Sequence, residues 1–322
     1  MSTYSLEELR RTFEALANTS DLGPDGTKVI DSGKQGPTVG LTICTHGNEP
    51  SGLAAFQRLL DTDVAARLQR GRLVVVINNL KATSDYFAST SEEEQRGCRF
   101  VDVNMNRLPE DREQWSFDQR YDVQRARELL PVWEQFDAAM DIHSTRKHSP
   151  AMFIVGDHVS LEHLRDFPIR TMISRIHHEQ IGLPTYCFYG GVGQETPVFE
   201  IEAGQHTSSR SFARAGACTE LYLQNVGVLA RPASFRRRRR SDPIALYEIG
   251  GTIIAPNRSY KLTKVFKDFE LVEKGTVLAT GDGGPIVMPW SGHVVFAPSQ
   301  VDIRYPDEEV MFLSRPVRNI ER

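Results

Sequence analysis

Residues 39–60, VGLTICTHGNEPSGLAAFQRLL, give the clearest indication of the fold. It begins with an apolar run typical of a buried strand and ends in a segment of helical spacing. The loop between them contains His46, Gly47 and Glu49. A strand therefore carries His46 to the carboxyl edge of a sheet, where ligand sites of open α/β sheets form. Gly47 gives this loop the freedom to turn His46 and Glu49 toward one point.

The same alternation of apolar runs and helical segments continues from Val39 to Gln224. It is typical of an α/β fold, in which helices cover a mostly parallel or mixed sheet. The predicted strands are Val39 to Thr45, Arg72 to Asn78, Ala138 to His143, Ala151 to Val155, Thr185 to Phe188 and Pro197 to Glu202. The predicted helices are Gly52 to Leu68, Arg120 to Phe136, Pro168 to Gln180 and Ser208 to Leu229.

A change of composition at Arg231 to Asp242, which contains the run Arg236 to Arg240, indicates a linker or an exposed loop. The apolar segments after it are short and bounded by Gly, Pro or Asp, which is typical of strands. We therefore expect an α/β domain over residues 1–235 and a smaller all-β module over residues 241–322. The strand candidates of this module are Gly251 to Ala255, Lys261 to Val265, Gly292 to Phe296 and Val310 to Ser314.

Composition limits the class of protein. The 322 residues are 40% hydrophobic and 25% charged, as in ordinary globular proteins. A net charge of -4 argues against a nucleic-acid partner. The N-terminus reads as an amphipathic helix rather than a secretory signal, and no apolar run is long enough to span a membrane, so we expect a cytoplasmic protein. Widely spaced Cys44, Cys98, Cys187 and Cys218 predict reduced thiols.

Imidazole nitrogens and carboxylate oxygens are zinc ligands, and catalytic zinc sites use three protein ligands and leave room for water. His46 and Glu49 supply two ligands, and His143 in DIHST, also at a strand end, is the candidate for the third. Asp141 could accept the other ring N–H of a ligand. The alternative is a chance HxxE spacing and a merely hydrogen-bonded His143. The remaining histidines lack a strand-end setting with a flanking acid: His148, His158, His163, His177, His178, His206 and His293.

A second group of polar residues lies in CRFVDVNMNRLPE, residues 98–110. Asn106 and Arg107 together can hold a carboxylate through charge-assisted hydrogen bonds. Arg99 can stabilise an oxygen that becomes negative when water adds to a carbonyl. The alternative is that these arginines form surface ion pairs with Asp102 and Glu110.

A general base is expected in TPVFEIEAGQH, residues 196–206. Glu200 and Glu202 are two residues apart, so a strand would place both on one face. Either carboxylate could take a proton from an activated water and return it to a leaving nitrogen. We favour Glu202 because Gly204 follows where the chain must turn, but the two roles could be reversed.

The motifs HGNE, CRFVDVNMNR, DIHST and EAG, in this order, resemble those of the succinylglutamate desuccinylase and aspartoacylase family, which is related to the zinc carboxypeptidases. The resemblance implies a zinc carboxypeptidase-like mixed sheet flanked by helices. It also implies one zinc ion per chain, with ligands matching His46, Glu49 and His143. By the same match, Arg99 polarises the carbonyl, Asn106 and Arg107 bind a substrate carboxylate, and Glu202 is the base.

Some positions depart from the family pattern. Asn104 and Met105 stand where the family has an acidic residue and then leucine before its Asn-Arg pair. No motif fixes a second carboxylate-binding arginine, although Arg146 and Lys147 follow the His143 strand and are candidates. The acyl group and the amino acid of the substrate therefore stay open, as does the oligomeric state.

The leading hypothesis is a zinc-dependent deacylase that removes an acyl group from a small N-acyl amino acid. A zinc carboxypeptidase acting on short peptides is the nearest alternative, since Asn106 and Arg107 could hold a peptide's terminal carboxylate. The β module could cap the cleft and restrict it to small substrates. Two other hypotheses are a binding protein that uses Arg236 to Arg240 for RNA or anionic membranes, and a thiol nucleophile at Cys44.

Overall fold

The computed structural model describes residues 4–156, 164, 166–190, 196–231, 243–302 and 309–320. The chain divides into two compact units. The first comprises Met1–Ile169 and Gly182–Arg240, and the second comprises Arg170–Ile181 and Ser241–Arg322. The segment 170–181, which the sequence assigns to the α/β domain, therefore belongs to the second unit. The basic run Arg236 to Arg240 lies outside the described residues.

The first unit is built on a mixed sheet with the strand order β1-β3-β2-β4-β7-β5. The inner strands β3, β2, β4 and β7 are parallel, whereas β1 and β5 pair antiparallel at either side. The parallel strands end at the same edge, which is where the sequence places its candidate site. The bounds are β1 Thr27–Asp31, β2 Thr38–Ile43, β3 Arg72–Ile77, β4 Ala138–Thr145, β5 Met152–Val155 and β7 Val198–Gln205.

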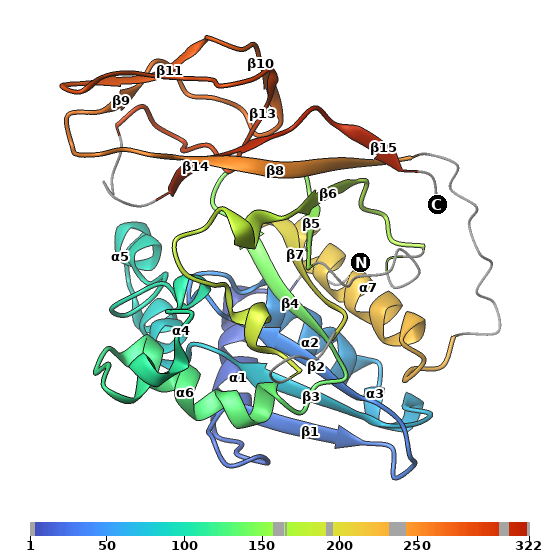
Figure 1. Ribbon diagram of the computed structural model, residues 1–322. Coiled ribbons are helices and arrows are strands. Elements are labelled where there is room, and N and C mark those ends of the chain that lie inside the picture. Colours follow the sequence, from blue (N-terminus) through green and yellow to red (C-terminus); the bar gives the residue numbers. More distant parts are fainter. Residues whose placement is uncertain are drawn as a thin grey trace. The chain divides into compact units, whose positions relative to one another are not determined.

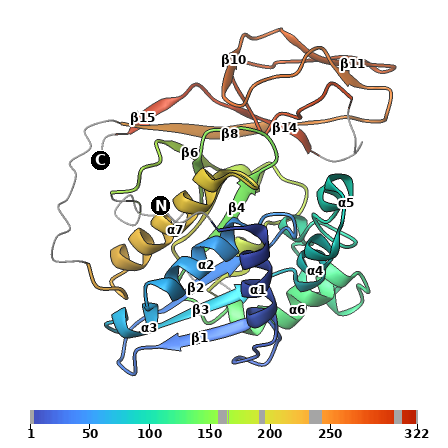
Figure 2. The same ribbon diagram turned by 180° about the vertical axis from the view of Figure 1, so that it is seen from behind.

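Helices cover both faces of this sheet. Figure 2 shows α1, α2 and α7 on one face, and Figure 1 shows α6 on the other. The bounds are α1 Leu6–Ala17, α2 Ser51–Asp61, α3 Val64–Arg67, α4 Leu80–Ala88, α5 Glu92–Gly97, α6 Tyr121–Trp133 and α7 Ser209–Asn225, with 3₁₀ helices η1 Met105–Arg107, η2 Arg112–Ser116 and η4 Thr185–Phe188. Among the described residues, no helix is long and apolar enough to cross a membrane.

Close packing against β2 requires glycine at two positions, Gly40 in the strand and Gly52 in α2. A Cβ atom at Gly52 of α2 would lie 2.5 Å from Ile43, and one at Gly40 would lie 2.4 Å from the Phe136 ring. Ile43 and Gly40 are an odd number of residues apart, so they face opposite sides of the sheet. Helix α2 and the segment after α6 therefore approach the same strand from opposite faces, which fixes the strand that leads to His46.

The second unit contains β6 Thr171–Ser174, η3 Ile176–His178, β8 Ile244–Ile254, β9 Lys261–Leu262, β10 Glu270–Val272, β11 Val277–Gly281, β12 Gly284–Val287, β13 Gly292–Val295, β14 Glu309–Ser314 and β15 Arg318–Ile320. Strands β6, β8, β14, β13 and β10 are neighbours in that order, β15 also pairs with β8, and β12-β11-β9 form a separate sheet. Its core includes Tyr260, Phe266, Leu278 and Met311.

Two predicted elements are wrong. Pro168 to Gln180, predicted as a helix, contains β6, which pairs in parallel with β8. This long-range pairing overrides the local helical spacing. Thr185 to Phe188, predicted as a strand, is the 3₁₀ helix η4. The Thr185 backbone N–H donates to the side chain of Asn106 at 3.2 Å, so it is not available to a strand neighbour.

Candidate metal centre

Backbone hydrogen bonds hold the loop after β2 in place. The backbone N–H groups of Asn78 and Asn79 donate to the backbone carbonyls of Ile43 and Cys44, both at 3.0 Å. A Cβ at Gly47 would lie 2.3 Å from the backbone of Ala82, so this position tolerates no side chain. The glycine therefore serves close packing, in addition to the turning freedom expected from the sequence, and the loop presents His46 and Glu49 in a fixed arrangement.

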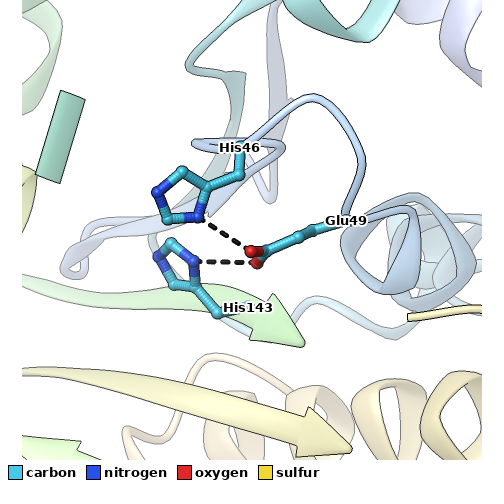
Figure 3. Close-up of side chains that lie close together, drawn as sticks. All are labelled: His46, Glu49 and His143. Atoms are coloured by element: carbon cyan, nitrogen blue, oxygen red, sulfur yellow. Dashed lines mark hydrogen bonds and ion pairs between the residues drawn. The ribbon is translucent and has the colours of Figure 1, made fainter. Parts of the chain in front are cut away.

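His46, Glu49 and His143 converge in the interior of the first unit (Figure 3). His46 Nδ1 lies 2.9 Å from Glu49 Oε1, and His143 Nδ1 lies 3.0 Å from Glu49 Oε2. All three side chains are buried, with exposures of 3%, 1% and 1%. Their ligand atoms lie within 4.8 Å of one another. Residues that are 94 positions apart in the chain thus offer two imidazole nitrogens and a carboxylate to one point.

The opposite ring nitrogens are also engaged. His46 Nε2 lies 2.9 Å from Asn104 Oδ1, and His143 Nε2 lies 3.3 Å from Asp141 Oδ2. The contact with Asp141 is the one expected from the sequence. Partners of this kind fix the ring orientation of metal-binding histidines and leave the other nitrogen for the ion. Each Nδ1 therefore carries the lone pair of a ready ligand when the ring is neutral.

Asp141 is itself anchored by hydroxyl groups. Thr45 and Thr185 donate to its carboxylate, both at 3.1 Å, and Tyr189 donates at 3.3 Å. Asp141, His143 and Glu200 form a second group of possible ligands. It shares His143 with the first group, and the hydroxyls already occupy Asp141. The set of His46, Glu49 and His143 is therefore the better fit to a divalent cation.

The charges of this buried group suit a cation. Burial opposes the ionisation of Glu49, but the adjacent His46 and His143 outweigh it and hold the pKa of the carboxyl well below its usual value. Burial lowers the pKa of His46 to about 4. For His143, the carboxylates of Asp141 and Glu200 outweigh burial and raise its pKa well above the usual value. A metal ion that binds His143 would therefore displace a proton from it.

The loop before η1 brings Arg99 to the centre. Arg99 Nη1 lies 3.2 Å from Glu49 Oε1, so it does not pair with Asp102, whose carboxylate accepts from the Tyr121 backbone N–H at 2.7 Å. The arginine side chain is 33% exposed, so the guanidinium remains reachable from outside. Its charge is thus directed at the candidate ligand Glu49.

Asp122, the second residue of α6, holds this loop. Its carboxylate accepts hydrogen bonds from the backbone N–H groups of Val101 at 3.3 Å, Asp102 at 2.7 Å and Val103 at 2.9 Å. It also accepts from Asn79 Nδ2 at 2.6 Å. Asp122 is fully buried. One carboxylate therefore organises the segment that leads from Arg99 to Asn104.

The Asn106 side chain lies inside the same site. Its Oδ1 accepts from the Thr185 backbone N–H at 3.2 Å and lies 3.0 Å from the Thr185 hydroxyl, and its Nδ2 donates to Glu200 Oε1 at 3.2 Å. The Nδ2 atom also lies 3.4 Å from His143 Nε2. Arg107 Nη1 donates to the Asn106 carbonyl at 2.6 Å. Asn106 and Arg107 thus lie beside the histidine cluster, and the Asn106 oxygen is already held by η4.

Glu200 and Glu202 share one face of β7, as the sequence predicts, and pair in register with Asp141 and His143 of β4. Glu200 is the residue held by Asn106. Burial raises its pKa to about 7. Burial, followed by the charge of Glu49, raises the pKa of Glu202 well above its usual value. Glu202 Oε2 is buried and has no hydrogen-bond partner in the described part of the chain. Gly204, with φ +115°, lies inside β7, where the register with β4 is irregular, and the strand continues to Gln205, so the chain does not turn at Gly204 as the sequence led us to expect.

The thiol hypothesis does not fit this geometry. Cys44 is fully buried, and burial raises the pKa of its thiol to about 12. His46, the expected base, faces Glu49 and Asn104 with its two ring nitrogens. A buried neutral thiol without a base is not a nucleophile.

Sequence reasoning missed three side chains of this site, Asn104, Asp122 and His206. In the sequence Asn104 is only a departure from the family pattern, but in the structure its side chain contacts the candidate ligand His46. Asp122 belongs to no recognisable motif. Its role comes from the hydrogen bonds that it accepts from the distant loop residues 101–103. His206 stands just beyond the strand that carries Glu202, and its Nδ1 lies 2.9 Å from Ser144 Oγ.

Comparison with known proteins identifies the family of the chain. Residues 35–231 match the family model described as the succinylglutamate desuccinylase/aspartoacylase catalytic domain. Comparison with curated proteins gives no match. The fold is similar to that of the succinylglutamate desuccinylase of Vibrio cholerae, with TM-score 0.66 and 14% identity over 90% of this chain and 86% of that one.

Two further solved structures have similar folds. The succinylglutamate desuccinylase of Chromobacterium violaceum has TM-score 0.65 and 17% identity over 96% of this chain and 97% of its own. The product-bound ectoine utilization protein of Ruegeria pomeroyi has TM-score 0.60 and 18% identity over 89% and 88%. At these identities the likeness shows the fold alone. The family match, which covers more than half of the chain, shows that this protein belongs to the succinylglutamate desuccinylase/aspartoacylase family of hydrolytic deacylases.

Proposed function

We propose that the chain is a zinc-dependent amide hydrolase that removes the acyl group from a small N-acyl amino acid. The observation that carries this proposal is the buried cluster in which Nδ1 of His46 and Nδ1 of His143 both face Glu49. Two imidazoles and one carboxylate are a donor set of catalytic zinc sites with an open position. We extend the proposal to a zinc carboxypeptidase-like fold with one ion per chain, and to residues 241–322 as a β module. The cytoplasmic location stays a prediction.

His46, Glu49 and His143 would hold the ion. When bound, zinc supplies a Lewis acid that polarises a carbonyl group and makes water more acidic. Glu202 would take a proton from the attacking water and return it to the leaving nitrogen. Its free Oε2 and its place beside His143 in the β4–β7 register support this role. A cation bound to Glu49 would offset the charge that raises the pKa of Glu202 and so favour its ionised form.

Arg99 and the Asn106–Arg107 pair would act on the substrate. Arg99, already directed at the metal ligands, would donate to the oxygen that becomes negative as the tetrahedral intermediate forms. Arg107 would bind the substrate carboxylate, together with an N–H of Asn106 Nδ2. Holding the carboxylate beside the cluster would place the scissile amide at the reacting centre.

The test is metal analysis of the purified chain combined with a substrate panel. We expect close to one zinc per chain, hydrolysis of at least one N-acyl amino acid, loss of that activity with chelator and its recovery with zinc. A short peptide series in the same panel addresses the carboxypeptidase alternative. Zinc binding with cleavage of peptides alone would replace the deacylase by the carboxypeptidase. The proposal would be overturned if the wild-type chain contained no zinc and its hydrolytic activity were unchanged by chelator.

A further inference from the structure

Strand β7 changes its pairing directly after Glu202. At this residue it lies opposite His143 of β4 on one side and Met152 of β5 on the other, and the pairing with β5 ends there. The next pair with β4 is Thr145 with Gln205, so β7 takes three residues to advance where β4 takes two. An extra residue of this kind is a β-bulge. The proposed general base is therefore the last regularly paired residue of β7.

Gly204 is the residue that makes this bulge possible. Its φ of +115° lies in the region that favours glycine. A Cβ atom at this position would lie 2.8 Å from Ser211 Oγ and 3.0 Å from Arg214 Nη1. Both side chains belong to α7, which covers one face of the sheet (Figure 2). Helix α7 thus packs two polar side chains directly against the backbone of the bulge.

The same two side chains bind the backbone carbonyls on either side of Gly204. Arg214 Nη1 donates to the Ala203 carbonyl, and Ser211 Oγ donates to the Gln205 carbonyl at 2.7 Å. Ser211 and Arg214 are three residues apart, so they lie on one face of the helix. A backbone carbonyl that is buried requires a donor. The helix therefore supplies donors where the regular strand pairing is interrupted.

The proposed role of Glu202 depends on this part of the backbone. Its Oε2 is buried and has no hydrogen-bond partner within the described ranges, so no hydrogen bond of its own holds that oxygen in place. Bulges bend a strand and change the direction of the side chains beside them. Ala203 follows Glu202 directly, so a change in the direction of its carbonyl changes the path of the strand at Glu202. The contact with Arg214 limits this change.

From these contacts we infer that Arg214 is a positioning residue for the proposed reaction. It holds the Ala203 carbonyl and so fixes the backbone from which Glu202 reaches the reacting centre, and Ser211 supports it at Gln205. This inference rests on the proposed deacylase function and on Glu202 as the base. A displacement of a reacting group by about 1 Å can cost about 100-fold in rate, so a contact to the backbone beside the base has a measurable effect on turnover.

The test combines Arg214→Ala with Glu202→Gln in a double-mutant cycle. In the wild-type background, Arg214→Ala should lower kcat about 10- to 100-fold and leave KM within about twofold. Zinc content should stay at the wild-type value. In the Glu202→Gln background, the same change should lower kcat by less than about twofold, because the base that Arg214 positions is already absent. A residue that only stabilises the fold would lower kcat by the same factor in both backgrounds.

Three further variants of α7 sharpen this test. Arg214→Lys keeps a donor for the Ala203 carbonyl and should recover most of the lost kcat. Ser211→Ala removes only the contact to Gln205 and should cause a smaller loss than Arg214→Ala. Arg210→Ala is the matched control, because Arg210 is an exposed arginine of the same helix. It should leave kcat, KM and zinc content unchanged.

Hydrogen exchange gives a measurement that does not depend on activity. The His206 backbone N–H donates to the Thr145 carbonyl at 3.0 Å, directly beyond the bulge. Its protection should fall in Arg214→Ala and return in Arg214→Lys, while the protection of β2 stays at the wild-type value. Unchanged protection of His206 in Arg214→Ala would contradict a role of Arg214 through the backbone.

The outcomes separate the two proposals. If zinc-loaded wild type hydrolyses none of the amides, the deacylase proposal fails and the role of Arg214 in it falls as well. If wild type is active but Arg214→Ala lowers kcat equally in both backgrounds, or in neither, only the assignment of Arg214 is overturned. Loss of zinc from Arg214→Ala would also overturn it, because the residue would then support the candidate ligands rather than the base.

Discussion

At the scale of single residues, the site depends on which atoms are already engaged and which are left open. Glu49 uses both oxygens on the two histidines, and Asp141 is occupied by hydroxyl groups. Glu202 keeps a free buried oxygen in the described part of the molecule. Two carboxylates of the same cluster can therefore have opposite roles, one as a ligand and one as a proton carrier, because their surroundings differ.

Replacing Glu202 tests the proton carrier. We expect Glu202→Gln to lower kcat about 10²- to 10⁴-fold, because the amide preserves the shape but cannot accept the proton. Zinc content, measured by metal analysis, should stay at the wild-type value. Glu200→Gln is the matched comparison, since Glu200 lies on the same face and its partner Asn106 can hydrogen-bond an amide oxygen equally well. If Glu202→Gln turned over substrate at a near-normal rate and Glu200→Gln were inactive, Glu200 rather than Glu202 would be the general base.

Replacing Asn104 tests the contact behind His46. Asn104 Oδ1 accepts the Nε2 proton of His46 when Nδ1 is free for a metal. Asn104→Ala should weaken zinc affinity about 10- to 100-fold, as losses of such outer contacts do. Asn104→Asp keeps the acceptor and should retain most of the affinity. A competition titration with a zinc-binding dye measures this, and equal affinity in Asn104→Ala and wild type would remove Asn104 from the metal centre.

At the scale of elements, the site is assembled where parallel strands end. His46 follows β2, His143 belongs to β4 and the two glutamates belong to β7. The in-register pairing of β4 with β7 places His143 opposite Glu202. The segment from Arg99 to Asn104 contains none of these strands and depends on α6 for its shape, through Asp122. A helix start thus positions a loop that supplies polar groups to the sheet edge.

Replacing Asp122 removes the hydrogen bonds that hold the loop from Arg99 to Asn104. Asp122→Ala would leave three backbone N–H groups and Asn79 without their acceptor. An unsatisfied buried donor costs about 1–3 kcal/mol, but residues 101–103 are partly exposed and water can replace part of the lost acceptor, so we expect a loss of about 3 kcal/mol in the free energy of unfolding for the four donors together. Activity should fall as well, because Arg99 loses its position. Urea unfolding measures the first effect and kcat/KM the second.

Asp85→Ala serves as the control for Asp122→Ala, because Asp85 forms an exposed i,i+4 pair with Lys81 on α4. Its loss should change stability by less than about 0.5 kcal/mol. If Asp122→Ala were as mild as this control, the loop would be held by other contacts.

At the scale of the whole molecule, the proposed metal ligands all lie in the first unit. Binding of zinc to the folded state stabilises that state in proportion to the logarithm of the zinc concentration over the dissociation constant. A chelator should therefore lower the thermal unfolding temperature of the first unit. At zinc concentrations about a thousandfold above the dissociation constant, the loss should approach about 4 kcal/mol.

Hydrogen exchange read separately in the two units checks this prediction. Protection of β2, β4 and β7 should fall on chelation more than protection of β8 and β14.

The pKa of His143, which Asp141 and Glu200 raise against the effect of burial, adds a pH dependence to zinc binding, because the proton on His143 must leave when zinc binds. Zinc affinity should therefore rise with pH. Uniform loss of protection, or affinity that falls with pH, would contradict this account.

The class of fold and the face shared by Glu200 and Glu202 follow from the sequence, as does the choice of His46, Glu49 and His143 as a group of candidate ligands. These features depend on periodicity and on short motifs at strand ends, which are local properties of the chain. The parallel edge then brings His46, Glu49 and His143 together, because successive strands of such a sheet end side by side. The errors at Thr185 to Phe188 and Pro168 to Gln180 have the opposite cause, since partners distant in the chain decide those segments.

The contacts that support the candidate ligands follow from the folded structure. Asn104 behind His46, Asp122 under the loop and Ser144 beside His206 are contacts between segments that no local pattern connects. Hydrogen bonds of this kind depend on where side chains point after the sheet and its helices have packed, and their energy comes from burial rather than from sequence spacing. The residues that perform the proposed reaction could thus be named from the chain, whereas the residues that hold them became visible only in the folded protein.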